Sequence, residues 1–244
     1  MKEIGGFLEW ETYSGAEYHQ EALALNSARN ALRFLLRARK IRSIWLPRLL
    51  CEVIEEACRA ENVEIRYYPV DASLRPVFLP EIARTEWVYL INYYGQYQKS
   101  EICEWAEQFH LILDNVQAFY TKPLDGLDTV YTCRKFFGVP DGAYLYTESV
   151  LPEELEQDSS CTRLEYLMGR FEHSANAFYG AYQQHEEQLG TLPIRWMSKG
   201  THNLLRTIDY ERAKHARENN FAYLHKGFGA VNRLNVRLPE GPYM

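Results

Sequence analysis

The stretch Leu111-Ile112-Leu113-Asp114-Asn115-Val116-Gln117-Ala118 decides the fold of this chain. It is a short apolar run that ends in an acid, which is the pattern of a buried parallel strand with Asp114 at its carboxyl end. Further along, residues 129–131 predict a second short strand, and the turn after it carries Lys135. In an open α/β sheet, ligands bind outside the carboxyl ends of the strands, so we expect Asp114 and Lys135 to face one crevice.

A carboxylate and an amine in one crevice have a joint chemical use. The amine forms a Schiff base with an aldehyde cofactor, and the carboxylate keeps the ring nitrogen of that cofactor protonated. Taken singly, an aspartate at a strand end is more often a cap, and a lysine in a loop is usually solvated. The neighbours of Lys135 favour the joint use, because Phe136 and Phe137 flank it and residues 138–142 lead into an apolar strand at 143–146. An apolar pocket lowers the pKa of a lysine, as a Schiff-base amine requires.

These segments resemble the sugar aminotransferases of the DegT/StrS type, which have the aspartate aminotransferase fold (fold type I) and use pyridoxal phosphate. That family carries an acid, two further residues and then Gln-Ala, as residues 114–118 do, and a lysine upstream of a Gly-rich turn, as residues 135–142 do. The resemblance covers about residues 5–147. It implies that Lys135 is the catalytic residue that holds the cofactor. It also implies that Asp114 pairs with the pyridine nitrogen and that Gln117 contacts the ring near its phenolic oxygen.

The segment Ser27-Ala28-Arg29 opens a predicted helix for which Ser27 is the N-cap. A helix N-terminus can hold a phosphate, but from the pattern alone an ordinary capped helix is the simpler interpretation. The family has Ser-Gly-Thr at this place, so the resemblance makes Ala28 and Arg29 cofactor-binding residues. Alanine hinders the close backbone approach that glycine permits, and we expect the charge of Arg29 to compensate. Thr132 lies three residues before Lys135 and is either a phosphate ligand or simply the last residue of a strand.

Alternating strand and helix patterns surround the motif and predict an α/β fold. We expect a mainly parallel sheet flanked by helices, with right-handed crossovers, as in the large domain of a fold-type-I pyridoxal-phosphate-dependent transferase. In the family, an aromatic residue stacks on the cofactor ring at a place that falls near Leu50 and Cys51, and neither is aromatic. Residues 92–96 resemble a family loop that either approaches the substrate or packs. The strands are predicted at 43–46, 63–68 and 86–92, and the helices at 50–61 and 102–109.

The character of the sequence changes after Thr147. Residues 152–189 keep helical spacing and predict one long amphipathic helix, and residues 198–235 predict a further helical stretch that ends near Gly227 and Gly229. We therefore divide the chain into a pyridoxal-phosphate-binding large α/β domain (1–150) and a helical extension with the start of a C-terminal small domain (151–244). The family carries a whole small domain at this place, so we expect either a truncated chain or a partner that supplies the missing part.

The composition narrows the classes of function. A net charge of −6 over 244 residues argues against a nucleic-acid partner bound through its phosphates. No apolar run reaches membrane-spanning length and no signal sequence is present, so we expect a cytoplasmic protein without a membrane partner. Five cysteines without paired spacing predict free thiols in a reducing compartment. Neither the cysteines nor the seven histidines cluster, so we expect no metal site.

The sequence thus predicts a pyridoxal-phosphate-dependent transamination. The resemblance implies a nucleotide-linked keto-sugar as acceptor in surface-polysaccharide or amino-sugar biosynthesis, an amino-acid donor such as glutamate, and a homodimer. One alternative is a degenerate, non-catalytic member that serves as a scaffold or binding protein. A second is an enzyme of another class that uses no pyridoxal, although no Gly-x-Gly-x-x-Gly fingerprint follows a strand. A dehydratase variant of the same chemistry also stays open.

Overall fold

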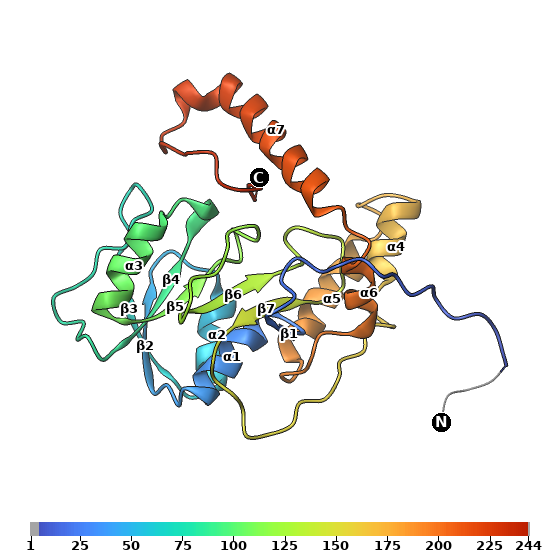
Figure 1. Cartoon of the computed structure of the whole chain (residues 1–244), viewed down its shortest axis with the longest axis horizontal. Coiled ribbons are helices and arrows are strands. Elements are labelled where there is room, and N and C mark those ends of the chain that lie inside the picture. The colour runs from blue at the N-terminus through green and yellow to red at the C-terminus, as the bar shows by residue number, and fades with distance from the viewer. Residues whose placement is uncertain (1–4, 244) are drawn as a thin grey trace.

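The centre of the molecule is a seven-stranded mixed sheet in the order β1-β7-β6-β5-β4-β2-β3, shown in Figure 1. The computed structural model describes residues 5–243. The five strands from β3 to β6 run parallel, and β7 is antiparallel to both β6 and β1, so the prediction of a mainly parallel sheet is confirmed. The strands are β1 (Leu23–Leu25), β2 (Ser43–Pro47), β3 (Glu64–Tyr68), β4 (Trp87–Ile91), β5 (His110–Asp114), β6 (Asp128–Thr132) and β7 (Ala143–Tyr146).

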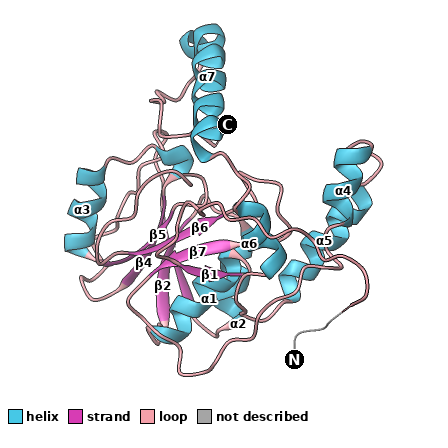
Figure 2. Cartoon of the chain, turned by 45° about the vertical axis from the view of Figure 1, so that its right-hand side comes forward, coloured by secondary structure: helices cyan, strands magenta, loops and turns pink. Residues whose placement is uncertain are grey.

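Helices flank the sheet and form most of the chain after β7. The crossovers through α2 and α3 run in opposite directions along the sheet, so right-handed connections place these two helices on opposite faces. Figure 2 shows α7 standing away from the sheet, with α4 and α5 on the side far from α3. The helices are α1 (Ala28–Ala38), α2 (Glu52–Ala60), α3 (Lys99–Gln108), α4 (Glu165–Glu172), α5 (Tyr179–Thr191), α6 (Lys199–Leu205) and α7 (Tyr210–Phe228), with short 3-10 turns η1 (Tyr93–Gly95) and η2 (Gly229–Val231).

The prediction of one long helix over residues 152–189 is wrong. The structure has α4 and α5 instead, and His173 leaves the helical conformation between them. Two contacts explain the break. The ring of Phe178 folds onto Gly169, where a Cβ atom would lie 2.2 Å from that ring, so only glycine leaves room for it. Upstream of α4, the Asp158 amide donates to the Trp196 carbonyl at 3.0 Å, which holds this part of the segment in extended backbone.

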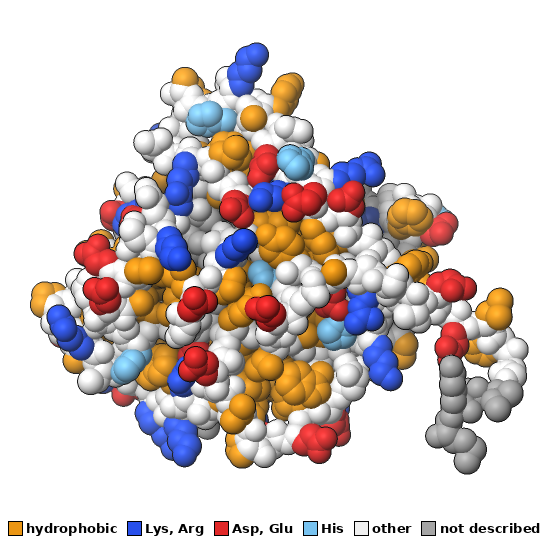
Figure 3. Space-filling view, in the orientation of Figure 1, with side chains coloured by type: hydrophobic (Ala, Val, Ile, Leu, Met, Phe, Trp, Pro, Cys, Tyr) orange, Lys and Arg blue, Asp and Glu red, His pale blue; other side chains and the backbone are white. Residues whose placement is uncertain are grey.

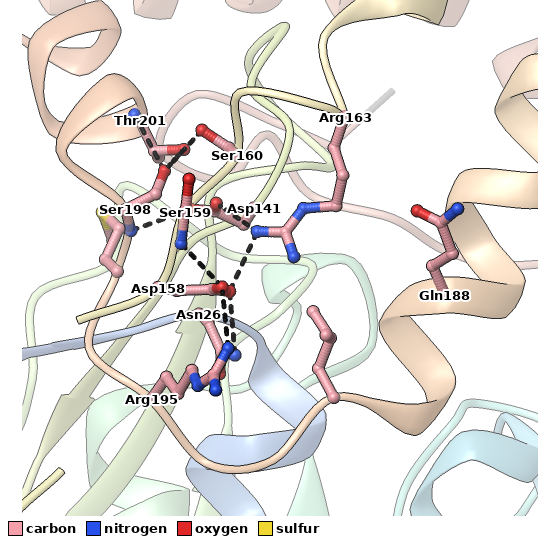
Figure 4. A network of polar contacts seen from close by, with 12 residues as sticks. Asn26, Asp141, Asp158, Ser159, Ser160, Arg163, Gln188, Arg195, Ser198 and Thr201 are labelled. Carbon is pink, nitrogen blue, oxygen red and sulfur yellow. Dashed lines mark hydrogen bonds and ion pairs between the residues drawn. The ribbon is translucent and has the colours of Figure 1, made fainter. Parts of the chain in front are cut away.

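A buried ion-pair network joins the loop before α4 to the loops that follow β1 and precede β7, two neighbouring strands (Figure 4). The guanidinium of Arg163 donates from Nη2 to Asp141 at 3.1 Å and to Asp158 at 2.9 Å. Asn26 donates to the same Asp158 carboxylate at 3.1 Å. All four side chains are buried. Asn26 immediately precedes the cap of α1, and Asp141 lies in the turn that follows Lys135, so the network fixes two loops relative to each other.

We expect Arg163→Ala to lower the free energy of unfolding by about 3–5 kcal/mol, because it removes the buried cation from two buried carboxylates and leaves Asp158 with only the more distant Arg195, 3.8 Å away. Denaturant titration measures this loss. Arg59→Ala is the matched control, since Arg59 is exposed and pairs with Glu55 one turn earlier on the surface of α2, outside the network, and such surface pairs contribute about 0–1 kcal/mol. Equal losses in the two variants would show that the Arg163 network does not stabilise the fold.

A second core, built mainly of aromatic rings, lies under the turn that carries Lys135. It includes Phe119, Tyr131, Phe136 and Tyr144. His19 is buried among them, with Nε2 2.8 Å from the Phe119 carbonyl oxygen and its ring 4.8 Å from that of Phe119. Burial lowers the pKa of His19 to about 4, although the contact with the Phe119 carbonyl opposes the shift.

His19 should make the fold sensitive to acid. Its pKa is lowered on folding, so the folded chain binds fewer protons than the unfolded chain between about pH 6.5 and pH 4. The free energy of unfolding therefore falls as the pH drops through that window, by up to about 3 kcal/mol from this residue. Denaturant titrations at several pH values should show a smaller slope in His19→Gln than in the exposed control His215→Gln. An unchanged slope in His19→Gln would contradict the assignment.

The surface mixes charges of both signs. On the face that Figure 3 shows, acidic and basic side chains are interspersed and hydrophobic side chains gather beneath α7. Large apolar side chains are exposed on the helices after β7, namely Met168, Phe171, Tyr179, Tyr223, Leu224 and Phe228. Exposed apolar patches of this kind commonly mark a contact surface. Within residues 5–243, no helix is long and apolar enough to cross a bilayer.

Candidate functional site

A cleft of about 700 Å³ opens at the carboxyl ends of β4, β5 and β6. That is the place where an open α/β sheet binds its ligands, and the volume suits a cofactor-sized molecule. All six side chains that the sequence singled out line this cleft, namely Ala28, Arg29, Asp114, Gln117, Thr132 and Lys135. The sheet therefore brings together residues that lie more than a hundred positions apart in the chain.

Asp114 is the last residue of β5 and its side chain is only 2% exposed. Tyr89 donates its hydroxyl to Oδ2 at 2.8 Å, and the Val116 amide donates to Oδ1 at 2.8 Å. Burial raises the pKa of the Asp114 carboxyl above its ordinary value, while the Val116 amide, the charge of Lys135 and the Tyr89 hydroxyl act in the opposite direction. The site thus holds a desolvated carboxylate, and any cationic or N–H group placed next to it would stabilise its charged form.

Lys135 lies on the turn after β6 and faces the same cleft as Asp114. The two phenylalanines beside it do not form the apolar pocket that was expected around its amine. Phe136 packs away from the cleft into the aromatic core, where its ring centroid is 5.4 Å from that of Phe119, and Phe137 also packs there. The side chain of Lys135 is exposed. The phenylalanines therefore anchor the turn and leave the amine accessible from the cleft.

The N-terminus of α1 forms one end of the cleft and is suited to an anion. Ser27 caps the helix by accepting from the Asn30 amide at 3.1 Å, and the Ala28 and Arg29 amides have no acceptor within residues 5–243. The guanidinium of Arg29 pairs with Glu56 at 3.0 Å, but its buried Nε has no partner among the described residues. Thr132 ends β6, as expected, and also lines the cleft, where its hydroxyl lies 3.5 Å from the Gly142 carbonyl oxygen, to which it donates. Its role as a phosphate ligand stays a prediction.

Gln117 is tied to the neighbouring loop. Its Oε1 accepts from the Tyr94 amide at 3.0 Å, and Tyr94 has a φ of 54°, in the left-handed region that non-glycine residues rarely adopt. The side-chain amide of Gln117 thereby supports a strained backbone turn. Its Nε2 makes no hydrogen bond within the described part of the chain, so it is the donor that remains for a ligand.

Sequence reasoning missed several residues of the cleft. Arg134 precedes Lys135, pairs with Glu186 of α5, and has a buried Nε without a partner in residues 5–243. Tyr182, Glu186 and Leu189 come from one face of α5. Their spacing of four and three residues was a usable signal, because such residues share one face of a helix. Tyr243 also lines the cleft, and the local sequence contains no pattern that predicts it.

Comparisons with known proteins bear on the fold. A scan against protein-family models finds no match, and a search of curated proteins finds none either. Solved structures do match. DesV of S. venezuelae, in complex with a ketimine intermediate, is 16% identical with a TM-score of 0.59 over 91% of this chain and 62% of its own. The sugar aminotransferase CalS13 from Micromonospora echinospora is 16% identical with a TM-score of 0.50 over 86% of this chain and 62% of its own.

A third similar structure is a DegT DnrJ EryC1 StrS aminotransferase from Brucella abortus, which is 14% identical with a TM-score of 0.51 over 86% of this chain. The chain spans about 60% of the length of these structures. The fold is that of the pyridoxal-phosphate-dependent aminotransferases of fold type I, as the sequence resemblance predicted.

Asp114→Asn should stabilise the cofactor-free chain at neutral pH. The raised pKa means that the folded state favours the protonated carboxyl, and this contribution to stability is lost as the pH rises through the folded-state pKa. Asparagine keeps the shape without the buried charge. We expect a gain of roughly 0.5–2 kcal/mol in urea denaturation at pH 7, shrinking at pH 5, and no change in the exposed control Asp125→Asn. A clear loss of stability in Asp114→Asn would contradict this account of the carboxylate.

Proposed function

We propose that this chain is a pyridoxal-phosphate-dependent aminotransferase with Lys135 as its catalytic residue. One observation carries the proposal: the amine of Lys135 and the buried carboxylate of Asp114 line the same cleft of an aminotransferase fold. A lysine that forms a Schiff base and an acid that meets a pyridine nitrogen are the protein groups that this cofactor needs. Their placement distinguishes the site from an ordinary strand-end crevice.

The residues present fit the cofactor. Arg29 and Arg134 each hold a buried Nε without a partner within residues 5–243, and two helix amides are free at Ala28 and Arg29. These are donors for a phosphate, and the hydroxyl of Thr132 lines the same cleft. We assign Ala28, Arg29 and Thr132 to the phosphate. At the other end, the free Nε2 of Gln117 is a donor for the phenolic oxygen of the ring.

Each side chain then has a task in transamination. Pyridoxal phosphate supplies the electron sink that stabilises negative charge on the substrate carbon. Asp114 holds the proton on the ring nitrogen, because a desolvated carboxylate binds a cationic partner strongly. Lys135 would hold the cofactor through its amine, and the free amine would move a proton to and from the substrate carbon as base and acid. The exposed position of Lys135 gives the amine the freedom that both tasks require.

The substrates are part of the same proposal. We assign the amino acceptor to the nucleotide-linked keto-sugars of surface-polysaccharide or amino-sugar biosynthesis, and the donor to an amino acid such as glutamate. The sugar aminotransferase among the similar structures supports the acceptor class. We also propose a cytoplasmic homodimer, consistent with five free thiols and with the apolar side chains exposed on α4, α5 and α7.

The domain division belongs to the proposal as well. Residues 1–150 form the cofactor-binding unit, since they contain the whole sheet and all six assigned site residues. Residues 151–244 form the helical extension and the start of a small domain. In enzymes that close over their substrate, such a domain shields the site from water.

Spectroscopy tests the proposal. Purified protein mixed with pyridoxal phosphate should develop the visible absorbance band of a lysine-linked cofactor. Lys135→Ala should abolish the band, because Lys135 is the only lysine among the described residues that line the cleft, and the exposed control Lys122→Ala should keep it. A donor such as glutamate should then bleach the band. A band that survives in Lys135→Ala contradicts the assignment, and a band that no amino donor changes favours the alternative of a non-catalytic scaffold.

A further inference from the structure

The C-terminal segment, residues 234–243, returns from the end of α7 toward the sheet, as Figure 1 shows for the red end of the chain. It forms part of the wall of the cleft, to which it contributes Leu234 and Tyr243. The segment is not held by regular secondary structure. Two sets of contacts join it to loops that follow strands at the open end of the sheet, and α7 adds an ion pair between Lys214 and Glu240 and a hydrogen bond from the Gly241 amide to Glu218.

The first anchor joins the segment to the loop after β4. The side chain of Gln96 donates from Nε2 to the Arg237 carbonyl at 3.0 Å and accepts from the Arg237 amide at 2.9 Å, so it pairs with the backbone in the manner of a neighbouring strand. Pro239 packs on Gly95, where a Cβ atom would lie 3.1 Å from the Pro239 side chain. Gly95 also has a φ of 69°, so glycine is required here both for space and for conformation.

The second anchor is Arg217, which lies on α7. Its guanidinium donates to the carbonyl oxygens of Pro242 at 3.1 Å and Tyr243 at 2.9 Å, and from Nη2 to that of Phe136 at 3.0 Å. It also lies over the Phe136 ring, 4.7 Å from the centroid. No carboxylate within residues 5–243 pairs with Arg217. The hydrogen bonds of the Arg217 guanidinium therefore join the end of the segment to the turn that carries Lys135.

This joint places the ring of Tyr243 beside the catalytic amine. Nζ of Lys135 lies 5.7 Å from the centroid of the Tyr243 ring, and that ring packs at 5.8 Å against Phe136. An ammonium within about 6 Å of a tyrosine face is attracted to it. The amine of Lys135 consequently has an aromatic side chain beside it in the cleft, and Arg217 binds the backbone carbonyl of the residue that carries that side chain.

We propose that Arg217 is a positioning residue that holds Tyr243 against Lys135, and that the segment thereby controls access to the amine. This inference rests on the proposed role of Lys135. Lys135 is exposed, so the ring covers one side of the amine, and a carbonyl compound that approaches from that side passes the Tyr243 ring or displaces it. The segment then forms the wall of the cleft beside the substrate, and its two anchors determine how easily the segment moves away from Lys135.

The test uses the full chain without added cofactor, so it does not depend on aminotransferase activity. Lys135 is acetylated with an activated acetate ester, and its rate of modification is followed by mass spectrometry of peptides, with Lys122 as internal reference. We expect Tyr243→Ala and Arg217→Gln to raise the relative rate at Lys135 by about two- to fivefold, the factor that corresponds to an exposed cation–π contact. The control Lys226→Gln, on the exposed part of α7, should leave the rate unchanged.

Hydrogen–deuterium exchange of residues 238–243 in the same samples separates the two parts of the inference. Arg217→Gln should speed exchange there, because it releases two backbone carbonyls, and Arg217→Lys should restore part of the protection. Unchanged acetylation of Lys135 in both variants would show that Tyr243 does not cover the amine. Faster acetylation in Tyr243→Ala alone would show that Arg217 does not position the ring. Neither result depends on whether pyridoxal phosphate binds, so failure here is distinguishable from failure of the proposed function.

Discussion

A buried carboxylate that faces an amine across one cleft is the constraint on which the rest of the structure depends. Taking the carboxylate of Asp114 out of water is unfavourable unless donors surround it. The fold provides two donors, the Tyr89 hydroxyl and the Val116 amide, and leaves the side toward Lys135 open. Because these two donors only partly offset the cost of burying the carboxylate, the site favours a ligand with a protonated ring nitrogen. The same feature reduces the stability of the chain when the ligand is absent.

The scaffold around the cleft keeps that geometry without help from the ligand. The aromatic core anchors the turn of Lys135 from below through Phe136. The Arg163 network fixes the loop before α1 to the turn after Lys135, through Asn26 and Asp141. These interactions act on two parts of the cleft, the N-terminus of α1 and the turn that carries Lys135. A cofactor that touches both parts requires their separation to be constant, which is a physical reason for placing a buried charge network at this point.

The sequence was sufficient for β2 to β7 because these strands follow local patterns, although it missed β1, and the resemblance to the sugar aminotransferases supplied the assigned site residues, which line one cleft. A short apolar run that ends in an acid, as at residues 111–114, indicates a buried strand and the position of its carboxyl end. The same reasoning failed over residues 152–189, since the helical spacing there says nothing about Phe178 folding onto Gly169. It also failed for the phenylalanines beside Lys135, which pack into the core. The direction in which they point depends on residues such as Phe119, which local patterns do not reveal.

The C-terminal segment shows the limit most clearly. Gln96 and Arg237 are 141 positions apart, and no periodicity or spacing relates them. Only the three-dimensional structure shows that Tyr243 lies beside Lys135 and that the guanidinium of Arg217 binds the Tyr243 carbonyl oxygen. Side chains that act through long-range contacts are therefore the part of the site that sequence reasoning omits, whereas side chains at strand ends and helix starts are the part that it recovers.

The central claim is that one cofactor ring contacts both Lys135 and Asp114. Nitrogen-15 NMR of the protein loaded with pyridoxal phosphate labelled at the ring nitrogen tests it most directly. The account predicts a protonated ring nitrogen in the wild-type chain and loss of that proton in Asp114→Asn, with the cofactor still attached to Lys135. A ring nitrogen that carries the same proton in both proteins, or carries none in either, would contradict it.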